Sequence, residues 1–474
     1  MDTVDASSRT DRHPGESYED ILALDTRPIP EHLRQGRVPD TGTEPVAADR
    51  YIDPEFFKLE AAHLWSHVWQ MACREEEIPN AGDTLIYEIV GKSLLITRQT
   101  DGSIHAFHNS CLHRGRKLAT HPGCKSEFRC PYHGFTWNID GSFRSNPISW
   151  DFPQWQSGRL ALPEARVELW GGFVFITFDY AAPPLKEILG DLVTHFAPYQ
   201  LENRYIDVHV VKHINCNWKA AAEAFMESHH SITTHPQILP FVADLNSQYD
   251  ALSDYVTRHF SAQMVSSPAI GHSLTESEIA RAALVGAART TEERQVIEQH
   301  VNVPEGITAR AFVAEQLRQM TKAESGYDHA AASDAELVDA LLYNVFPNFS
   351  VWAGFGGKLV YRWRPHGTDT DRSIMDIYIL KLVPKGQPRP KPAPAFEIGL
   401  GESILELGPT AGLMPGLAAV FEQDVQNLPH VQQGLKASET GLVHFGAYSE
   451  MRLRLLHQMI DRYIAKGKLS KASF

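Results

Sequence analysis

Cysteine is scarce in this sequence, since its 474 residues include only five: Cys73, Cys111, Cys124, Cys130 and Cys216. Small secreted domains stapled by disulfides use a denser and usually even set, so this sparse, odd set excludes a disulfide framework. Reduced thiols remain available as metal ligands or as small buried apolar side chains. The length allows two or three domains, each with a core of its own.

Long apolar runs are missing as well. The first twenty residues, MDTVDASSRTDRHPGESYED, are polar and acidic and do not resemble a secretory signal. The longer apolar runs, such as GGFVFITF at 171–178, are too short to span a bilayer. We therefore expect no membrane insertion and a reducing, cytoplasmic location.

Positive charge is not in excess: 44 Lys and Arg stand against 58 Asp and Glu, and the formal net charge is -14. Such a surface repels nucleic acid and anionic lipid, so neither is expected as a partner. The sequence also lacks a G-x-G-x-x-G dinucleotide motif and a plant-type C-x4-C-x2-C cluster motif. Any electrons that this chain uses must therefore come from a separate protein.

The first part of the chain changes character twice. Residues 1–50 have no apolar period and are predicted to form an extended or disordered N-terminal arm. Helical spacing of apolar residues at 52–72 predicts a helix that begins at Asp53-Pro54. Short apolar runs broken at Gly91-Lys92 and Asp101-Gly102 then predict hairpins and a small all-β domain.

Strand-like and helical segments mix in the remainder. Helical patterns recur near 275–340, where Ser333 and Glu336 form a plausible capping box, and again from Met451 onward. The prediction is an α+β protein in which an antiparallel sheet carries helices on one side. The predicted parts are an arm, a β domain with its preceding helix, and a larger domain: 1–50, 51–190 and 191–474.

Two cysteine–histidine pairs lie within the β region. Cys111-x-His113 is followed, after sixteen residues, by Cys130-x-x-His133. Thiolates and imidazoles suit zinc or an iron–sulfur cluster. Because each loop supplies one residue of each kind, the pattern favours an asymmetric two-iron cluster, with Cys111 and Cys130 on one iron and both histidines on the other. A structural zinc site is the alternative.

A second constellation lies in NWKAAAEAFMESHHSITTHP at 217–236. Glu227 and His230 are expected on one helix face, and a distorted last turn would bring His235 beside His230. Two histidines and a carboxylate with open positions can bind non-haem iron(II), which reacts with O2. Asp424, in VFEQDVQNLPHVQQGL, is the best candidate for that carboxylate, and Glu422 is its local rival.

Together these motifs resemble those of the Rieske non-haem iron oxygenases, the α subunits of aromatic ring-hydroxylating oxygenases. The resemblance covers nearly the whole chain, from LWSHVW through C-x-H-x16-C-P-Y-H-G-F to QQGL. It implies a helix-grip (START-like) catalytic domain behind the Rieske domain. It also implies a [2Fe–2S] cluster on Cys111, His113, Cys130 and His133, and a mononuclear Fe(II) on His230, His235 and Asp424.

The resemblance further implies a role for Glu227. In the family, a carboxylate at this place connects a Rieske histidine of one subunit to an iron histidine of the next within a head-to-tail trimer. Here it would join His133 of a neighbouring subunit to His230, accepting from both imidazoles. Many relatives carry Asp at this place. His229 stands where relatives usually carry Tyr, and we interpret it as a supporting or packing histidine rather than a ligand.

The implied function is that of a terminal oxygenase, a mono- or dioxygenase, in aromatic hydrocarbon catabolism. It would hydroxylate an aromatic or hydrophobic substrate with O2 and electrons from NAD(P)H, through a reductase and in some systems a ferredoxin. The assembly would be a homotrimer, α3, or α3β3 with a small β subunit. The alternatives are a monooxygenase or demethylase acting on an N- or O-alkyl or quaternary ammonium substrate, and a Rieske electron carrier. Candidate pocket residues are Phe225, Met226, Phe346, Phe349 and Trp352.

Overall fold

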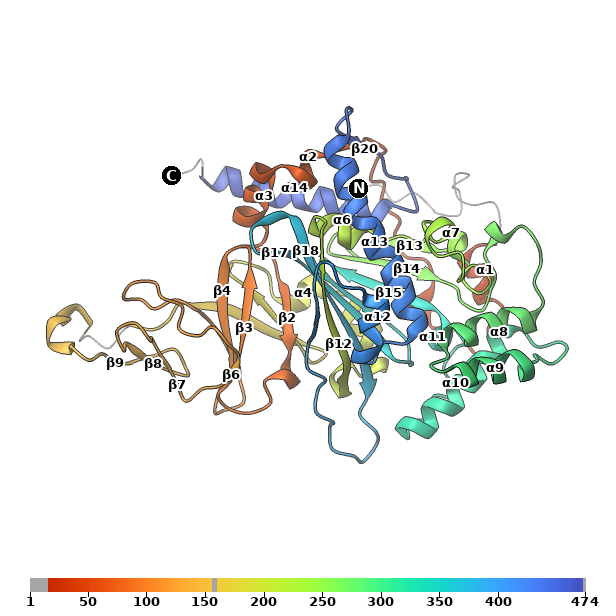
Figure 1. Cartoon of the computed structure of the whole chain (residues 1–474), viewed down its shortest axis with the longest axis horizontal. Coiled ribbons are helices and arrows are strands. Elements are labelled where there is room, and N and C mark those ends of the chain that lie inside the picture. Colours follow the sequence, from red (N-terminus) through yellow and green to blue (C-terminus); the bar gives the residue numbers. More distant parts are fainter. Residues whose placement is uncertain (1–15, 156–159, 472–474) are drawn as a thin grey trace. The chain divides into compact units, whose positions relative to one another are not determined.

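The structure, a computed structural model, describes residues 16–155 and 160–471, with side chains up to residue 467. The chain forms two compact units (Figure 1). In the described residues, the small unit comprises Lys58–Glu187, Pro365–Thr368 and the chain from Tyr463. The large unit comprises the chain up to Phe57, Ile188–Arg364 and Asp369–Arg462. The units are therefore not contiguous in sequence, unlike the linear division that the sequence predicts.

Antiparallel sheets build the small unit, as the hairpin signals predict. One has seven strands in the order β2-β11-β10-β5-β4-β3-β6, and another has three in the order β7-β8-β9. Gly91 and Gly102 have φ of 80° and 86°, the left-handed conformation that these hairpin turns require. The strands are β2 (Gln70–Arg74), β3 (Asp83–Ile89), β4 (Lys92–Arg98), β5 (Ile104–His108), β6 (Gly123–Cys124), β7 (Glu127–Arg129), β8 (Thr136–Asn138), β9 (Phe143–Ser145), β10 (Glu164–Trp170) and β11 (Phe173–Thr177).

The helix predicted at 52–72 is only partly present. Helix α3 (Pro54–Leu59) passes into a π-helical turn at Glu60–Leu64, and strand β2 begins at Gln70. This segment forms a strand and not a continued helix because Met71 pairs with Phe175 of β11, which supplies backbone partners that a helix could not use. Apolar spacing alone could not show this change.

An eight-stranded sheet forms the centre of the large unit, in the order β13-β14-β15-β16-β17-β18-β12-β19. The pairs β13–β14, β14–β15, β15–β16, β16–β17 and β12–β18 are antiparallel, and the pair β12–β19 is parallel. One face packs against the long helix α13, which is drawn in blue across the sheet in Figure 1. The strands are β12 (Arg204–Ile214), β13 (Gln248–Ala251), β14 (Val256–Ser261), β15 (Ala340–Val345), β16 (Phe349–Trp352), β17 (Lys358–His366), β18 (Asp369–Leu382) and β19 (Phe396–Ile398). The predicted α+β class, an antiparallel sheet with helices over it, is confirmed.

The helical patterns predicted near 275–340 are largely present. The last of them is shorter than predicted, because the Ser333–Glu336 capping box forms but helix α11 (Ala335–Val338) ends at Val338. The chain then enters β15, because residues from Ala340 pair with β14. The helices of the large unit include α2 (Asp49–Ile52), α5 (Leu192–Phe196), α6 (Trp218–Glu223), α7 (Ser231–Thr234), α8 (Glu276–Ala287), α9 (Thr291–His300), α10 (Ala309–Ser325), α11 (Ala335–Val338), α12 (Ile404–Leu407) and α13 (Pro415–Ala437), together with α14 (Met451–Lys471) as far as Arg462. Among the residues that the structure describes, no helix is long and apolar enough to cross a membrane.

The N-terminal arm, predicted to be extended or disordered, is not disordered from residue 16 onward and forms part of the large unit; residues 1–15 lie outside the described part. Helix α1 (Tyr18–Leu22) buries Tyr18, and Asp25 forms an ion pair of 2.6 Å with Arg310 of α10. The backbone N–H of Thr26 donates to Asp334 at 2.7 Å. A buried ion pair and a hydrogen bond thus attach this segment to the large unit, although its own sequence has no apolar period.

Candidate metal centres

The two cysteine–histidine loops of the small unit have the same backbone pattern. Cys111 and Cys130 each donate their N–H to the carbonyl five residues further on, at 2.9 and 2.8 Å. Their own carbonyls accept from Gly115 and Gly134, four residues on, at 2.8 and 3.0 Å. Both glycines lie in the left-handed region, with φ of 77° and 74°. Because tight turns of this kind need glycine, Gly115 and Gly134 allow the two cysteine–histidine loops to adopt the same turn.

The four predicted ligands come together at the tips of these loops. Cys111 and Cys130 are each 2% exposed, and the His113 and His133 rings are 4.7 Å apart. The Nδ1 atoms of both histidines are buried and have no hydrogen-bond partner among the described residues. Burial raises the pKa of the Cys111 thiol, and its neighbour Cys130 adds to this effect. Two buried thiols and two unpartnered imidazole nitrogens are a donor set that fits a Rieske cluster.

Aromatic side chains surround the loops. Phe135 stacks on His113 with ring centroids 4.5 Å apart, and Trp137 is fully buried in the same apolar cluster. Tyr132 lies against His133 with centroids 3.8 Å apart, yet is 55% exposed. Cys124 is exposed and separate from the set. The site is thus shielded on the Trp137 side and approachable at Tyr132.

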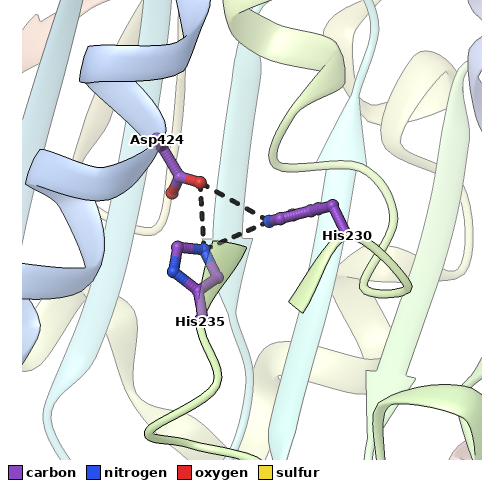
Figure 2. A group of neighbouring side chains, drawn as sticks. All are labelled: His230, His235 and Asp424. Carbon is purple, nitrogen blue, oxygen red and sulfur yellow. Dashed lines mark hydrogen bonds and ion pairs between the residues drawn. The ribbon is translucent and has the colours of Figure 1, made fainter. Parts of the chain in front are cut away.

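In the large unit, His230, His235 and Asp424 point toward one another (Figure 2). Asp424 Oδ1 lies 3.0 Å from His235 Nε2 and 3.5 Å from His230 Nε2, and the two Nε2 atoms are 3.2 Å apart. His235 and Asp424 are 3% and 5% exposed, whereas His230 is partly exposed. Three ligand atoms within 4.8 Å of one another are an arrangement that can hold a metal ion.

The local chain differs from the predicted helix. Helix α6 ends at Glu223, so Glu227 and His230 do not share a helix face, although a turn still brings them together. Tertiary partners take the backbone groups that a helix would have used: the Met226 carbonyl accepts from Arg452 at 3.0 Å, and the Ser228 N–H donates to Tyr249 at 3.1 Å. His230 and His235 flank the four-residue helix α7 at its two ends.

Hydrogen bonds at Nδ1 orient both imidazoles. His230 Nδ1 is 2.5 Å from Glu227 Oε1, and His235 Nδ1 is 2.7 Å from Gln423 Oε1. Each bond places the hydrogen on Nδ1 and leaves Nε2 free to face the site, which is how metal-binding histidines are usually held. Sequence reasoning missed Gln423, although its position directly before Asp424 was an available signal.

Negative charge dominates the surroundings of the two histidines. Although burial opposes it, the contacts with His229 and His230 hold the pKa of Glu227 well below its ordinary value. Burial also opposes protonation of His230, but Asp424 and Glu227 raise its pKa to about 10. The two carboxylates thus favour positive charge at this position. His229 Nδ1 lies 2.8 Å from Glu227 Oε2, an ion-pair contact outside hydrogen-bond geometry.

The rival carboxylate has a different place. Glu422 accepts from the N–H groups of Ile404 and Leu405 at the start of α12, at 2.7 and 3.1 Å. Three arginines of the sheet, which by charge alone could pair with a substrate carboxylate, are likewise engaged within the chain: Arg258 pairs with Asp250, and Arg362 and Arg364 pair with Asp376. Both carboxylates are fully buried, so these pairs belong to the structure of the sheet.

The predicted pocket residues do not form one group. Phe225 packs among Tyr361, Trp363 and Phe421, with ring centroids 5.3, 5.6 and 6.1 Å away. Trp352 packs against the same apolar cluster. Met226 and Phe346 line a different cavity of about 20 Å³, and Phe349 is buried in β16.

The four rings Phe225, Tyr361, Trp363 and Phe421, hereafter the aromatic group, lie close to the predicted iron ligands. Phe421 precedes Asp424 by three residues in α13. Burial raises the pKa of Tyr361 well above its ordinary value, and the charge of Asp424 adds to this effect. Sequence reasoning missed three of these rings. The alternation in YRWR and the helical position of Phe421 were the available signals.

Comparison with known families agrees with this organisation. The family described as "Ring hydroxylating alpha subunit (catalytic domain)" matches residues 195–466, more than half of the chain. The "Rieske [2Fe-2S] domain" matches residues 68–156. The first match contains the His230, His235 and Asp424 group, and the second contains both cysteine–histidine loops.

Proteins with described activities are similar to parts of this chain. The glycine betaine monooxygenase oxygenase subunit of Chromohalobacter salexigens is 29% identical over 271 residues, which are 53% of this chain and 60% of that protein. The large oxygenase component of the naphthalene 1,2-dioxygenase system of Pseudomonas putida is 34% identical over 197 residues, 40% of this chain and 43% of that protein. This chain thus matches less than two thirds of either relative.

Known structures show the same fold. The quaternary ammonium Rieske monooxygenase CntA with L-carnitine has a TM-score of 0.61 at 15% identity, covering 89% of this chain and 96% of CntA. A naphthalene 1,2-dioxygenase mutant bound to phenanthrene has a TM-score of 0.60 at 20% identity, covering 90% and 93%. The resemblance inferred from the motifs is confirmed: this chain belongs to the ring-hydroxylating α-subunit family, with a Rieske [2Fe–2S] domain preceding its catalytic domain.

Proposed function

We propose that this chain is the oxygenase component of a Rieske oxygenase system that oxidises a quaternary ammonium or other N-alkyl substrate. The observation that carries the proposal is the meeting of His230, His235 and Asp424 next to the aromatic group. When bound, an iron(II) ion at this group and a [2Fe–2S] cluster on the small unit supply O2 activation and electron delivery.

The residues of the chain have separate tasks. His230 and His235 present Nε2 to the metal because Glu227 and Gln423 hold their Nδ1 atoms. Asp424 completes the ligand set from helix α13. We infer that a substrate would bind against the aromatic group on the side of Phe225, its one partly exposed ring, where the apolar surface would keep water from the ligands.

The aromatic group also supports the choice of substrate. Aromatic ring faces attract a cation without requiring a carboxylate, and quaternary ammonium groups are often bound in this way. The similarity to a glycine betaine monooxygenase subunit and the fold shared with a carnitine-binding monooxygenase point the same way. These findings favour the N-alkyl alternative over the aromatic hydroxylation that the sequence motifs first suggest.

The chemistry balances with external electrons. An N-methyl group, O2, two electrons and two protons give a hydroxymethyl group on nitrogen and one water. The hydroxymethyl intermediate then loses its C–N bond to release formaldehyde, the tertiary amine and one proton. Because the sequence has no nicotinamide- or flavin-binding motif, the electrons come from NAD(P)H through a separate reductase, directly or by way of a ferredoxin.

Assembly follows from the same family resemblance. We infer a head-to-tail trimer, α3 or α3β3, in which Glu227 joins His230 to His133 of a neighbouring subunit. The side chain of Glu227 is 9% exposed and already touches two imidazoles of its own chain. A carboxylate oxygen has two lone pairs, so Glu227 can accept from one more donor.

Aromatic hydroxylation is the second candidate. It rests on the 34% identity to the naphthalene 1,2-dioxygenase component and on the same aromatic group, whose faces also suit a planar ring. The two candidates differ in the group that is oxidised, which is an N-alkyl group in the first and an aromatic ring in the second; a quaternary ammonium substrate would also carry a positive charge.

The test begins with metal analysis of anaerobically purified protein. About three irons and two sulfides per chain, with a Rieske-type EPR signal after dithionite, are expected. The protein is then supplied with a reductase and NADH, and tested with glycine betaine, carnitine, naphthalene and an aromatic carboxylate. Formaldehyde or another aldehyde together with an amine supports the proposal. Diol formation from naphthalene alone supports the second candidate, and zinc without sulfide refutes both.

A further inference from the structure

Two glutamine side chains, Gln237 and Gln423, form a pair beside His235. The Nε2 atom of His235 faces Asp424 and His230 (Figure 2), and its other ring nitrogen, Nδ1, lies 2.7 Å from Gln423 Oε1. Gln423 Oε1 accepts a second hydrogen bond, also of 2.7 Å, from Gln237 Nε2. Gln423 Nε2 donates back to Gln237 Oε1 at 3.2 Å. The two amides are thus bonded reciprocally, and both lone pairs of Gln423 Oε1 are used.

The local chain explains why the two glutamines meet. The Ile238 N–H donates to the His235 carbonyl at 3.0 Å, and this turn keeps Gln237 next to His235. Gln423 comes from helix α13, where it directly precedes Asp424. Gln237 is exposed and Gln423 is half-buried. The pair therefore joins the turn that carries one predicted iron ligand to the helix that carries another.

The two histidines of the site have Nδ1 partners of different chemistry. The partner of His230 is the carboxylate of Glu227, which can only accept, so either of its oxygens draws the imidazole hydrogen to Nδ1. The partner of His235 is an amide, which accepts at one end and donates at the other. If the donating end of Gln423 faced Nδ1, the hydrogen of His235 would lie on Nε2 and would block metal binding there. The orientation of the Gln423 amide therefore decides whether His235 can be a ligand.

Gln237 restricts this orientation. Either amide can be turned over, but turning only one of them sets N–H against N–H and C=O against C=O, and both reciprocal bonds are lost. Gln423 therefore cannot turn alone while Gln237 stays bonded to it. Turning both amides together keeps the pair but places an N–H group against His235 Nδ1. A metal ion on Nε2 selects against that arrangement, so the one observed is the arrangement that binds metal.

We propose that Gln237 is a positioning residue of the oxygenase, which holds the Gln423 amide so that His235 keeps its hydrogen on Nδ1 and its Nε2 atom free. The inference rests on the proposed function, which places iron(II) on His230, His235 and Asp424. Gln237 acts through Gln423 and is not a catalytic residue. Because apparent metal affinity falls with the fraction of molecules that have the wrong form of the imidazole, the pair raises affinity without a new metal contact.

The test measures the dissociation constants of iron(II) and cobalt(II) for the full chain, under anaerobic conditions and by competition with a chelator. The variants are Gln237→Met, Gln423→Glu and the two combined. Gln426→Met is the matched control, because Gln426 is an exposed glutamine of α13 whose side chain bonds Glu422 at 2.9 Å. Rieske cluster content and the melting temperature are recorded for every variant, to establish that the fold is intact.

The affinities should follow the orientation of the amide. Gln237→Met should weaken the binding of both ions about 3- to 10-fold, which is what one net hydrogen bond is worth. Gln423→Glu should bind at least as tightly as the wild type, because a carboxylate accepts from His235 Nδ1 in either orientation. Adding Gln237→Met to Gln423→Glu should then change the affinity less than about twofold, since the orientation no longer matters. Gln426→Met should bind as the wild type does.

A spectroscopic readout reports on the imidazole itself. In the cobalt(II) protein, the Nδ1–H hydrogens of the two bound histidines give exchangeable, paramagnetically shifted proton NMR signals. Gln237→Met should speed the exchange of the His235 signal with solvent and leave the His230 signal unchanged, and Gln423→Glu should restore slow exchange. The His230 signal is identified by its change in Glu227→Gln.

Wild-type affinity and exchange in Gln237→Met would refute the role of Gln237. The same loss of affinity with and without Gln423→Glu would also overturn it, because Gln237 would then act through the turn and not through the amide. If Gln237→Met lowers the melting temperature, Gln237→Ala decides the question in its place. A wild-type chain that binds neither ion would refute the iron site of the proposed function together with this inference, whereas tight wild-type binding that Gln237→Met leaves unchanged would refute this inference alone.

Discussion

Two glycines of helix α13 allow a quantitative test of how the helix holds Asp424. A Cβ on Gly416 would lie 2.0 Å from the Gly286 carbonyl oxygen at the end of α8. A Cβ on Gly434, in the same helix, would meet nothing within 4 Å. The same substitution, glycine to alanine, should therefore have opposite effects at the two positions.

The magnitudes follow from these distances. Gly434→Ala removes the conformational cost of glycine in a helix and should stabilise the protein by about 0.8–1.0 kcal/mol. Gly416→Ala must push α13 away from α8, because real Cβ atoms do not approach within 3.0 Å, and overpacking of this kind costs about 1–3 kcal/mol. At about 2.1 cal/mol/K per residue, unfolding of a 474-residue chain shifts the melting temperature by about 1 °C per kcal/mol, so Gly434→Ala should raise it by about 1 °C and Gly416→Ala should lower it by about 1–3 °C.

Metal binding adds a second consequence. Asp424 follows Gly416 by eight residues, about 12 Å along the helix axis, so movement at the start of α13 shifts Asp424 away from His230 and His235. We expect Gly416→Ala to retain less iron after dialysis while its Rieske signal is unchanged, and Gly434→Ala to retain as much as the wild type. Circular dichroism melts and iron analysis test both statements. A Gly416→Ala protein with wild-type stability and iron would refute the close contact and the reasoning built on it.

Further predictions concern single side chains. Asp424→Ala should lose the mononuclear iron but keep a normal Rieske EPR signal, and an equal loss of both would contradict separate sites. Cys130→Ser should do the opposite, with the cluster lost and the mononuclear iron kept. Glu227→Ala should keep both centres yet lose coupled turnover, and normal turnover would exclude a bridging role. Burial opposes ionisation of Asp376, but the positive charges of Arg362 and Arg364 hold the pKa of Asp376 well below the ordinary value. Asp376→Asn should therefore cost about 3–5 kcal/mol near neutral pH, with the deficit shrinking as pH falls below about 4, where the unfolded carboxyl is protonated.

The features that were predictable from sequence are those set by neighbouring residues. The Cys111 and Cys130 loops are short turns whose geometry depends on a glycine four residues on, so spacing alone specifies them. His230 and His235 lie close together because a single short helix separates them. The placement of Asp424 needed the family resemblance, since nothing near it in sequence indicates which segment it faces.

The features that sequence reasoning missed depend on contacts across the fold. The 217–230 segment has strong helical spacing, yet α6 stops at Glu223 because Arg452 and Tyr249 take backbone groups beyond it. The aromatic group draws its rings from three elements, and Asp25 is held by an arginine almost three hundred residues away. Such contacts leave no periodic signal in a local window.

The break after α6 lowers the stability of the fold, because it depends on a buried arginine, but it positions Glu227. Arg452 is fully buried, and burial lowers its pKa to about 9, although Tyr249, Asp250 and Glu227 oppose the change. Its hydrogen-bond acceptors are neutral, namely the Met226 carbonyl, Asn344 and Thr257. Burying a guanidinium without a bonded carboxylate is costly, and a continued helix would satisfy the Met226 carbonyl without it. The cost makes sense if the break has a function, because it turns Glu227 back against His229 and His230 instead of leaving it on a helix surface.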